Sequence, residues 1–138
     1  MFDRILVPVD LTKRAKIGVD SAASLAGGGK VEIPLLHVIE RIEYVDLDEL
    51  KSLYDKLETT AKRYLSTLAR RLPRKRITVI KTVLVGKRVN TIVDFAKKHE
   101  TDLIILACQP TGPSSYGNFG AISNQVALRA SCNVLLLK

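Results

Sequence analysis

The sequence lacks any long apolar run. Its apolar segments are about five to seven residues long, whereas a helix needs about twenty such residues to cross a bilayer. It also lacks the basic, apolar and small-residue series of a secretion signal, because Met1 leads directly into a strand pattern. We therefore expect a cytoplasmic protein with no membrane segment.

Cysteine is scarce, with only Cys108 and Cys132 in the chain. Cys108 ends one predicted strand and Cys132 begins the next. If these strands are parallel, the two thiols lie at opposite edges of the sheet, about five residues or 16 Å apart, too far for a disulfide. Neither thiol has a histidine close in sequence, so we predict two free, non-catalytic cysteines in a reducing compartment.

The chain also lacks the residue patterns of catalysis. It contains no Ser/His/Asp arrangement, no paired acids, no metal-ligand cluster and no P-loop signature. His37 lies inside a predicted strand and is interpreted as a hydrogen-bonded core residue. His99 ends a charged helix and is expected at the surface. We predict a protein that is not an enzyme.

Strand and helix patterns alternate along 138 residues, with 46% hydrophobic and 26% charged residues. This pattern predicts one soluble α/β domain spanning residues 1–138, a doubly wound five-stranded parallel sheet with helices on both faces. The predicted strands are 5–9, 31–39, 77–85, 103–107 and 134–137. The predicted helices are 13–26, 46–72, 89–99 and 120–130. Thr12 and the Asp46–Glu49 segment are interpreted as helix N-terminal caps, and Pro34 predicts a strand start, a bulge or an edge.

The predicted sheet has an expected ligand site. In open parallel sheets, ligands bind beyond the carboxyl ends of the strands where the strand order reverses. With the order 3-2-1-4-5, that point lies between the first and fourth strands. The segments Asp10–Arg14 and Cys108–Phe119 follow those two strands, so we expect them to converge on the site.

Several segments in this order carry a resemblance to a known family: ILVPVD at 5–10, LLHVI at 35–39, Gly86, Asp102-Leu-Ile, and the closing strand–loop–helix–strand. The chain resembles the universal stress proteins over essentially its whole length. The resemblance implies a fold like that of the adenine-nucleotide alpha-hydrolases.

The resemblance also implies a nucleotide site. The residue at the position of Asp10, with Pro8 and Val9 before it, contacts the nucleoside. The backbone at Val38 meets the adenine. A glycine loop and the start of the last helix cradle the phosphates.

The phosphate half of this site is degenerate in the sequence. The family signature is Gly, two residues, Gly, nine residues, Gly, then Ser or Thr; here those positions hold Ala107, Pro110, Gly120 and Ala121. Ala107 adds a methyl group where the backbone must approach, Pro110 has no N–H, and Ala121 lacks a hydroxyl. Three lost hydrogen bonds to a charged group, at about 1.5–3 kcal/mol each, would cost several orders of magnitude in affinity. We predict no obligatory cofactor and only weak binding of AMP or ATP.

A first alternative remains open for the same loop. Gly112, Ser114, Ser115, Gly117 and Asn118 are interpreted as turn residues. In another register they could rebuild an anion site. The chain would then be a genuine AMP- or ATP-binding member, with slow hydrolysis as a further option.

A second alternative rests on charge. The net charge is +8, and residues 62–76 hold seven basic groups and no acidic one. We interpret this cluster as a solvated helix end, where Arg70 and Arg71 face the negative end of the helix dipole. The alternative is a nucleic-acid-associated protein that uses this patch, although no nucleic-acid-binding motif accompanies it.

The last strand predicts a partner surface formed by Val134, Leu135, Leu136 and Leu137. As an outer strand it would offer unpaired backbone groups, unless it is a short edge protected by Lys138. The resemblance implies pairing with the same strand of a second subunit, which gives a homodimer with two-fold symmetry. The sequence as a whole thus predicts a homodimeric regulator or sensor whose downstream protein partner is unknown.

Overall fold

The computed structural model describes residues 2–43, 46–108 and 121–138. The strands are β1 (Ile5–Pro8), β2 (Val31–Glu40), β3 (Ile77–Gly86), β4 (Leu103–Ala107) and β5 (Asn133–Leu137). The helices are α1 (Ala15–Leu25), α2 (Leu47–Ala69), α3 (Arg88–Lys98) and α4 (Ala121–Arg129). Their alternation along the chain confirms the α/β class that the sequence predicts.

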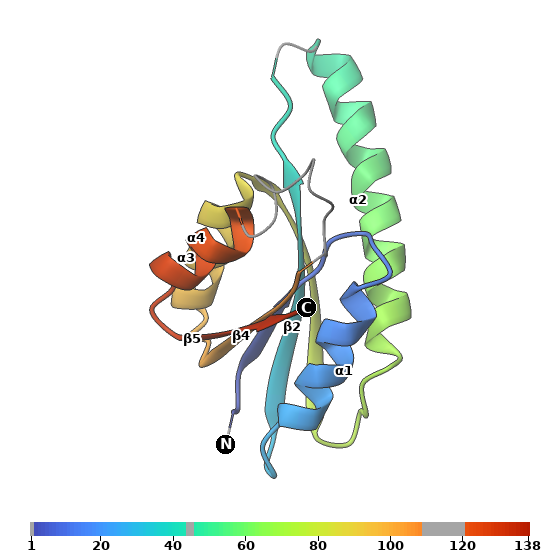
Figure 1. Cartoon of the computed structure of the whole chain (residues 1–138). Coiled ribbons are helices and arrows are strands. Elements are labelled where there is room, and N and C mark those ends of the chain that lie inside the picture. Colours follow the sequence, from blue (N-terminus) through green and yellow to red (C-terminus); the bar gives the residue numbers. More distant parts are fainter. Residues whose placement is uncertain (1, 44–45, 109–120) are drawn as a thin grey trace.

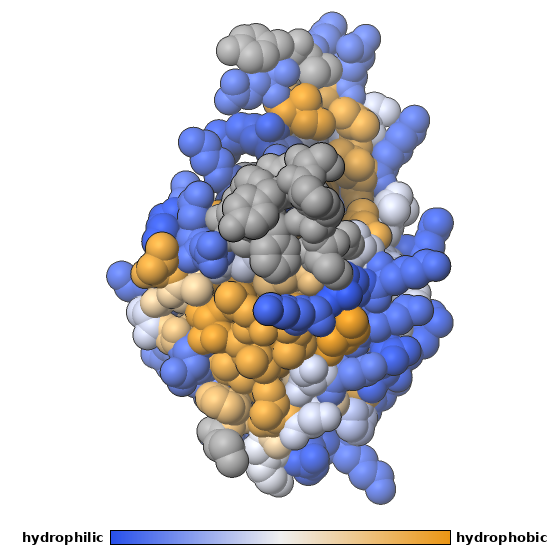
Figure 2. Space-filling model, viewed as in Figure 1, coloured by the Kyte–Doolittle hydropathy of each residue, from blue (hydrophilic) through white to orange (hydrophobic). Residues whose placement is uncertain are grey.

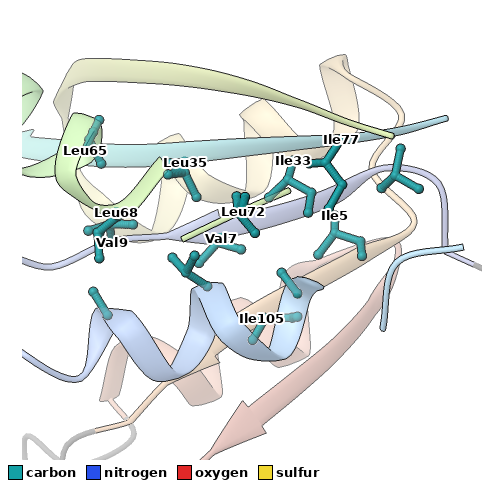
Figure 3. Close-up of a cluster of buried hydrophobic side chains, with 14 of the residues drawn as sticks. Ile5, Val7, Val9, Ile33, Leu35, Leu65, Leu68, Leu72, Ile77 and Ile105 are labelled. Carbon is teal, nitrogen blue, oxygen red and sulfur yellow. The ribbon is translucent and has the colours of Figure 1, made fainter. Parts of the chain in front are cut away.

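The strands form one parallel sheet in the order β3-β2-β1-β4-β5. Helices α1 and α2 cover one face, and α3 and α4 cover the other (Figure 1). Each face has its own core of buried side chains, and Figure 3 shows the one beneath α1 and α2. Because β1 is interior, its Ile5, Leu6 and Val7 are all buried, as expected for a parallel strand covered on both sides. The predicted doubly wound sheet is therefore confirmed.

Helix α1 lies close to the sheet because its inward face is made of small residues. Ala15, Gly18, Val19 and Ala22 are its buried positions. A Cβ atom at Gly18 would lie 3.3 Å from Val7 Cγ1 and 4.0 Å from Ala107 Cβ. Gly18 therefore marks where α1 meets β1 and the carboxyl end of β4.

Pro34 does not lie at a strand start, a bulge or an edge. It occupies the middle of the interior strand β2, opposite Ile80 of β3. The pairing of β1 with β2 is interrupted there, between the bridge Arg4–Glu32 and the pair Val7–Leu35. The register of the two strands is the same on both sides of this gap, so the gap is the effect of Pro34 itself, whose missing N–H would face β1.

The first helix also differs from its prediction. Thr12 is not its N-cap: α1 begins at Ala15, and Arg14 takes the cap position without a side-chain hydrogen bond. Thr12 instead accepts the Ala15 N–H through its carbonyl at 3.3 Å, in a tight turn before the helix. Asp46 is the N-cap of α2, as predicted, and its carboxylate accepts the Asp48 N–H.

Helix α2 is the longest element, with 23 residues, and its first half extends past the carboxyl edge of the sheet (Figure 1). It ends at Ala69, and a turn then leads to Pro73, which agrees with the predicted stop. Within the described residues, none of the helices combines the length and apolar character needed to cross a membrane.

Candidate functional site

The strand order reverses between β1 and β4, as predicted. β1 pairs with β2 through Val7 and Pro8 and with β4 through Ile5 and Leu6. The segment that follows β1 therefore emerges at the carboxyl edge of the sheet, beside the end of β4. This is the position at which ligands bind in doubly wound sheets.

Two hydrogen bonds fix Val9 directly after β1. Its N–H donates to the Leu36 carbonyl at 2.7 Å, and its carbonyl accepts a bond from His37 Nδ1 at 2.7 Å. Because a carbonyl only accepts, Nδ1 of His37 carries the proton. His37 is hydrogen-bonded, as predicted, but it is partly exposed at the candidate site rather than enclosed in the core.

Asp10 holds the next turn in place. Its Oδ1 accepts from the Thr12 N–H at 3.1 Å and from the Thr12 hydroxyl at 2.6 Å. The Tyr64 hydroxyl of α2 donates to the Thr12 carbonyl at 2.6 Å. Burial raises the pKa of Tyr64, and the nearby negative charge of Asp10 raises it further. The Asp10 side chain is thus exposed at the sheet edge, on a turn that α2 braces from one side.

Strand β2 continues past the end of β1, and among the described residues part of its backbone on that side has no partner. Alternate residues of a parallel strand bond to alternate neighbours. Glu32 donates to the Asp3 carbonyl and Leu36 accepts from Val9, so even-numbered residues of β2 face β1. Val38 therefore directs its N–H and carbonyl toward the space beyond Pro8, where β1 has ended.

The β4 side of the site ends in Ala107, which is partly buried. Cys108 follows; its N–H donates to the Leu137 carbonyl at 2.7 Å, and its Sγ lies 3.3 Å from Ser123 Oγ of α4. Ala121 opens α4. The predicted positions Pro110 and Gly120 lie outside the described residues. Pro8, Val9, Asp10, Val38 and Ala107 are thus brought to one edge of the sheet.

The family model of the universal stress protein family matches residues 1–138. The chain belongs to this family. The resemblance that the strand motifs indicate is therefore confirmed over the whole length.

Solved structures share the fold. The hypothetical protein MJ0577 is 25% identical over 100% of this chain and 96% of its own, with a TM-score of 0.85. The universal stress protein UspA from Lactobacillus plantarum is 23% identical over 99% of this chain and 98% of its own, with a TM-score of 0.75. A universal stress protein family member from Arabidopsis thaliana, solved with AMP bound, is 15% identical over 99% of this chain and 91% of its own, with a TM-score of 0.69.

The sequence patterns of this universal stress protein do not single out two residues near this edge. Arg14, at the start of α1, has its Nε and Nη2 atoms buried without a hydrogen-bond partner among the described residues. Tyr64 is likewise absent from the sequence predictions, because it lies 52 positions from Thr12 and only the fold brings the two together. A weak signal for Arg14 does exist, because it lies one helical turn before the inward-facing Gly18.

The predicted dimer surface is on β5, the outer strand at the end of the sheet away from β3. Leu136 is 40% exposed there, and the other three apolar residues of the strand are partly exposed. Leu135 also lines a groove of about 370 Å³ with Ile17 and Leu25 of α1. Figure 2 shows a hydrophobic patch in the region of β5.

The basic cluster at residues 62–76 is partly engaged within the fold. Arg71 donates to both carboxylate oxygens of Asp20, at 2.9 and 2.7 Å, and Arg76 donates to the Gly27 carbonyl. Lys62 pairs with Glu58 one turn earlier on α2. The other four basic residues of the cluster are exposed, which agrees with its interpretation as the solvated end of a helix: Arg63, Arg70, Arg74 and Lys75.

Tyr64→Phe is expected to lower the free energy of unfolding by about 0.5–1.5 kcal/mol, because it removes the donor to the Thr12 carbonyl. Since the pKa of Tyr64 is raised on folding, its contribution is present below about pH 10 and is lost as the pH rises through the raised value. Urea unfolding at pH 8 and in strongly alkaline solution measures both effects.

Tyr54→Phe is the matched control, since the Tyr54 hydroxyl accepts from Ile42 N–H far from Asp10. An unchanged stability of Tyr64→Phe at pH 8 would contradict the bracing role.

Proposed function

We propose that this universal stress protein is a cytoplasmic, homodimeric regulator or sensor that is not an enzyme. Its carboxyl sheet edge between β1 and β4 binds an adenine nucleotide weakly. The observation that carries the proposal is the backbone of Val38, which has no partner among the described residues on the β1 side, next to the braced Asp10 turn. Binding of this ligand, rather than a reaction on it, would supply the signal.

The nucleoside half of the proposed site is formed by β1 and β2. A strand residue whose own N–H and C=O point to the same side offers one donor and one acceptor, which match the donor and acceptor edge of adenine. Val38 is such a residue, and it lies beyond Pro8. The Asp10 carboxylate is exposed and already held by Thr12, so it can accept hydrogen bonds from ribose hydroxyls with little loss of conformational freedom.

The phosphate half of the proposed site is weaker. Ala107 carries a methyl group at the end of β4, where the family signature has glycine, and that methyl lies 4.0 Å from the position that a Cβ at Gly18 would take. Pro110 has no backbone N–H to donate to a phosphate, and Ala121 has no hydroxyl. ATP should therefore gain little over AMP, because donors for its outer phosphates are missing.

Calorimetric titration of nucleotide-free protein with AMP and ATP, with and without magnesium, tests the proposal. We expect dissociation constants near the millimolar range for both nucleotides, with little effect of magnesium. Asp10→Ala should weaken AMP binding about tenfold or more, because it removes a charged acceptor. Asp10→Asn removes the negative charge but keeps a side-chain oxygen that can accept from Thr12. Comparing it with Asp10→Ala separates the effect of the charge on AMP binding from the effect of a disrupted turn.

The matched control is Asp94→Ala, which removes an exposed carboxylate from α3. It should leave AMP binding unchanged. An absence of heat at millimolar AMP would contradict the nucleotide site and direct the search to protein partners of the dimer. Turnover of ATP to ADP would contradict the assignment as a protein that is not an enzyme.

A second candidate function is tight AMP or ATP binding through a rebuilt phosphate loop. The AMP-bound structure of the Arabidopsis thaliana family member, which has a similar fold, favours it. Micromolar ATP binding that Asp10→Ala abolishes would establish this candidate and contradict the weakened site. A nucleotide that copurifies with the protein would lead to the same conclusion.

A further inference from the structure

Arg14 is an unusual residue in the fold because part of its guanidinium group is buried without a partner. Its Nε and Nη2 atoms make no hydrogen bond with the described residues. The ion pairs of the described residues involve other basic groups: Arg4, Lys62, Arg71 and Arg88. Asp10, the acid nearest to it in sequence, directs its Oδ1 to Thr12 instead.

The position of Arg14 places it at the carboxyl edge of the sheet. It is the residue directly before α1 and lies four positions before Gly18. Residues four apart lie on the same side of a helix, and the Gly18 side faces Val7 and Ala107. Arg14 therefore lies one turn beyond the contact of α1 with the end of β4, on the side of the helix that faces the sheet.

A buried guanidinium without an acceptor is costly, because its donors have lost water and gained nothing in return. An anion would remove that cost. The planar guanidinium donates two parallel hydrogen bonds from Nε and one Nη atom, and this geometry fits two oxygens of a phosphate. Nε and Nη2 are the two atoms that the fold leaves without a partner.

We propose that Arg14 binds a phosphate group at the carboxyl edge of the sheet, through Nε and Nη2. The assignment rests on the proposed function, in which the nucleoside lies between Asp10 and Val38. It adds a cationic side chain where the family signature relies on glycine backbone. The group recognised is a phosphate monoester or pyrophosphate, carried by a nucleotide or free in solution.

The test compares adenosine, AMP and inorganic pyrophosphate on wild-type protein, Arg14→Met, Arg14→Lys and Lys13→Met. Wild-type protein should bind AMP at least tenfold more tightly than adenosine. Arg14→Met should weaken AMP binding about tenfold to a hundredfold and change adenosine binding less than about twofold. Arg14→Lys should recover only part of the loss, since an ammonium group lacks the planar fork. Lys13→Met is the matched control, because it removes an adjacent exposed charge and should leave all three ligands unaffected.

Two outcomes would overturn the assignment to Arg14. One is AMP binding that Arg14→Met leaves unchanged. The other is an equal loss of AMP and adenosine binding in Arg14→Met, which indicates that Arg14 only supports the fold. Thermal unfolding in phosphate-free buffer checks the same point: Arg14→Met should melt at or above the wild-type temperature, and a fall of several degrees would contradict the proposal.

The pyrophosphate titration separates this proposal from the proposed function. If neither adenosine nor AMP binds, the nucleotide site is wrong. In that case pyrophosphate is the only ligand that tests Arg14. If pyrophosphate raises the melting temperature of the wild-type protein and does not raise that of Arg14→Met, the result supports the anion site. No rise in either protein overturns it.

Discussion

Ile105→Ala is expected to lower the free energy of unfolding by about 2–5 kcal/mol, the largest stability effect that we predict. Ile105 is fully buried in the middle of β4, and its Cγ2 lies 4.0 Å from the position of a Cβ at Gly18. Truncation leaves a cavity between β4 and α1 that the close-packed helix cannot fill. The corresponding fall in melting temperature is about 8–20 °C for a domain of this size.

Ile80→Ala is the matched control for this substitution. Ile80 lies on the outer strand β3 and is 39% exposed, so its truncation should cost about 1 kcal/mol or less. Urea unfolding of both variants at one protein concentration measures the difference. Equal losses in the two variants would show that α1 does not pack against β4 as described.

Leu136→Lys is expected to convert the proposed homodimer to monomers. Leu136 is 40% exposed on the outer strand β5, so the isolated subunit should tolerate lysine. In a dimer with two-fold symmetry, β5 lies beside its own copy, and the substitution places two like charges in one desolvated interface. We expect the dissociation constant to rise about thirtyfold or more, as for a central interface residue. Sedimentation velocity over a concentration series measures it.

Leu84→Lys is the matched control, since Leu84 is 37% exposed on β3, the other outer strand of the sheet. It should leave the association state unchanged, and both variants should unfold within about 1 kcal/mol of wild-type protein. A dimer that survives Leu136→Lys and dissociates on Leu84→Lys would move the interface to β3. A wild-type protein that is monomeric at micromolar concentration would remove the dimer from the proposed function.

The alternation of strand and helix patterns is sufficient to predict a parallel sheet with both faces covered, whereas the order 3-2-1-4-5 is one of the few regular orders that it allows. The period of apolar residues is a local property, and right-handed crossovers leave few arrangements for five parallel strands. The β4 bounds match the prediction, because a fully apolar strand between polar residues has clear ends. Boundaries of α1 and α2 differ by a few residues, because helix ends depend on turns that the apolar period does not encode.

Pro34 shows where a local rule fails. Proline predicts an edge or an irregular strand when only the sequence is considered. The structure places it in an interior strand that pairs without a break with β3 and keeps one register with β1 on both sides of Pro34. The sheet thus loses only the bond that the missing N–H would have donated to β1, and its other pairs on both sides hold the strand in place.

The sequence by itself determined the fold, the family and the edge of the sheet at which a ligand would bind. These follow from periodic apolar residues and from motifs that are contiguous in the chain. Only the tertiary structure decided how the edge is built: Tyr64 bracing Thr12, Val38 extending past β1, and Arg14 buried without a partner. Such contacts join residues far apart in sequence or depend on burial by several elements at once. No local pattern specifies them, because their energy arises only when the packed elements exclude water.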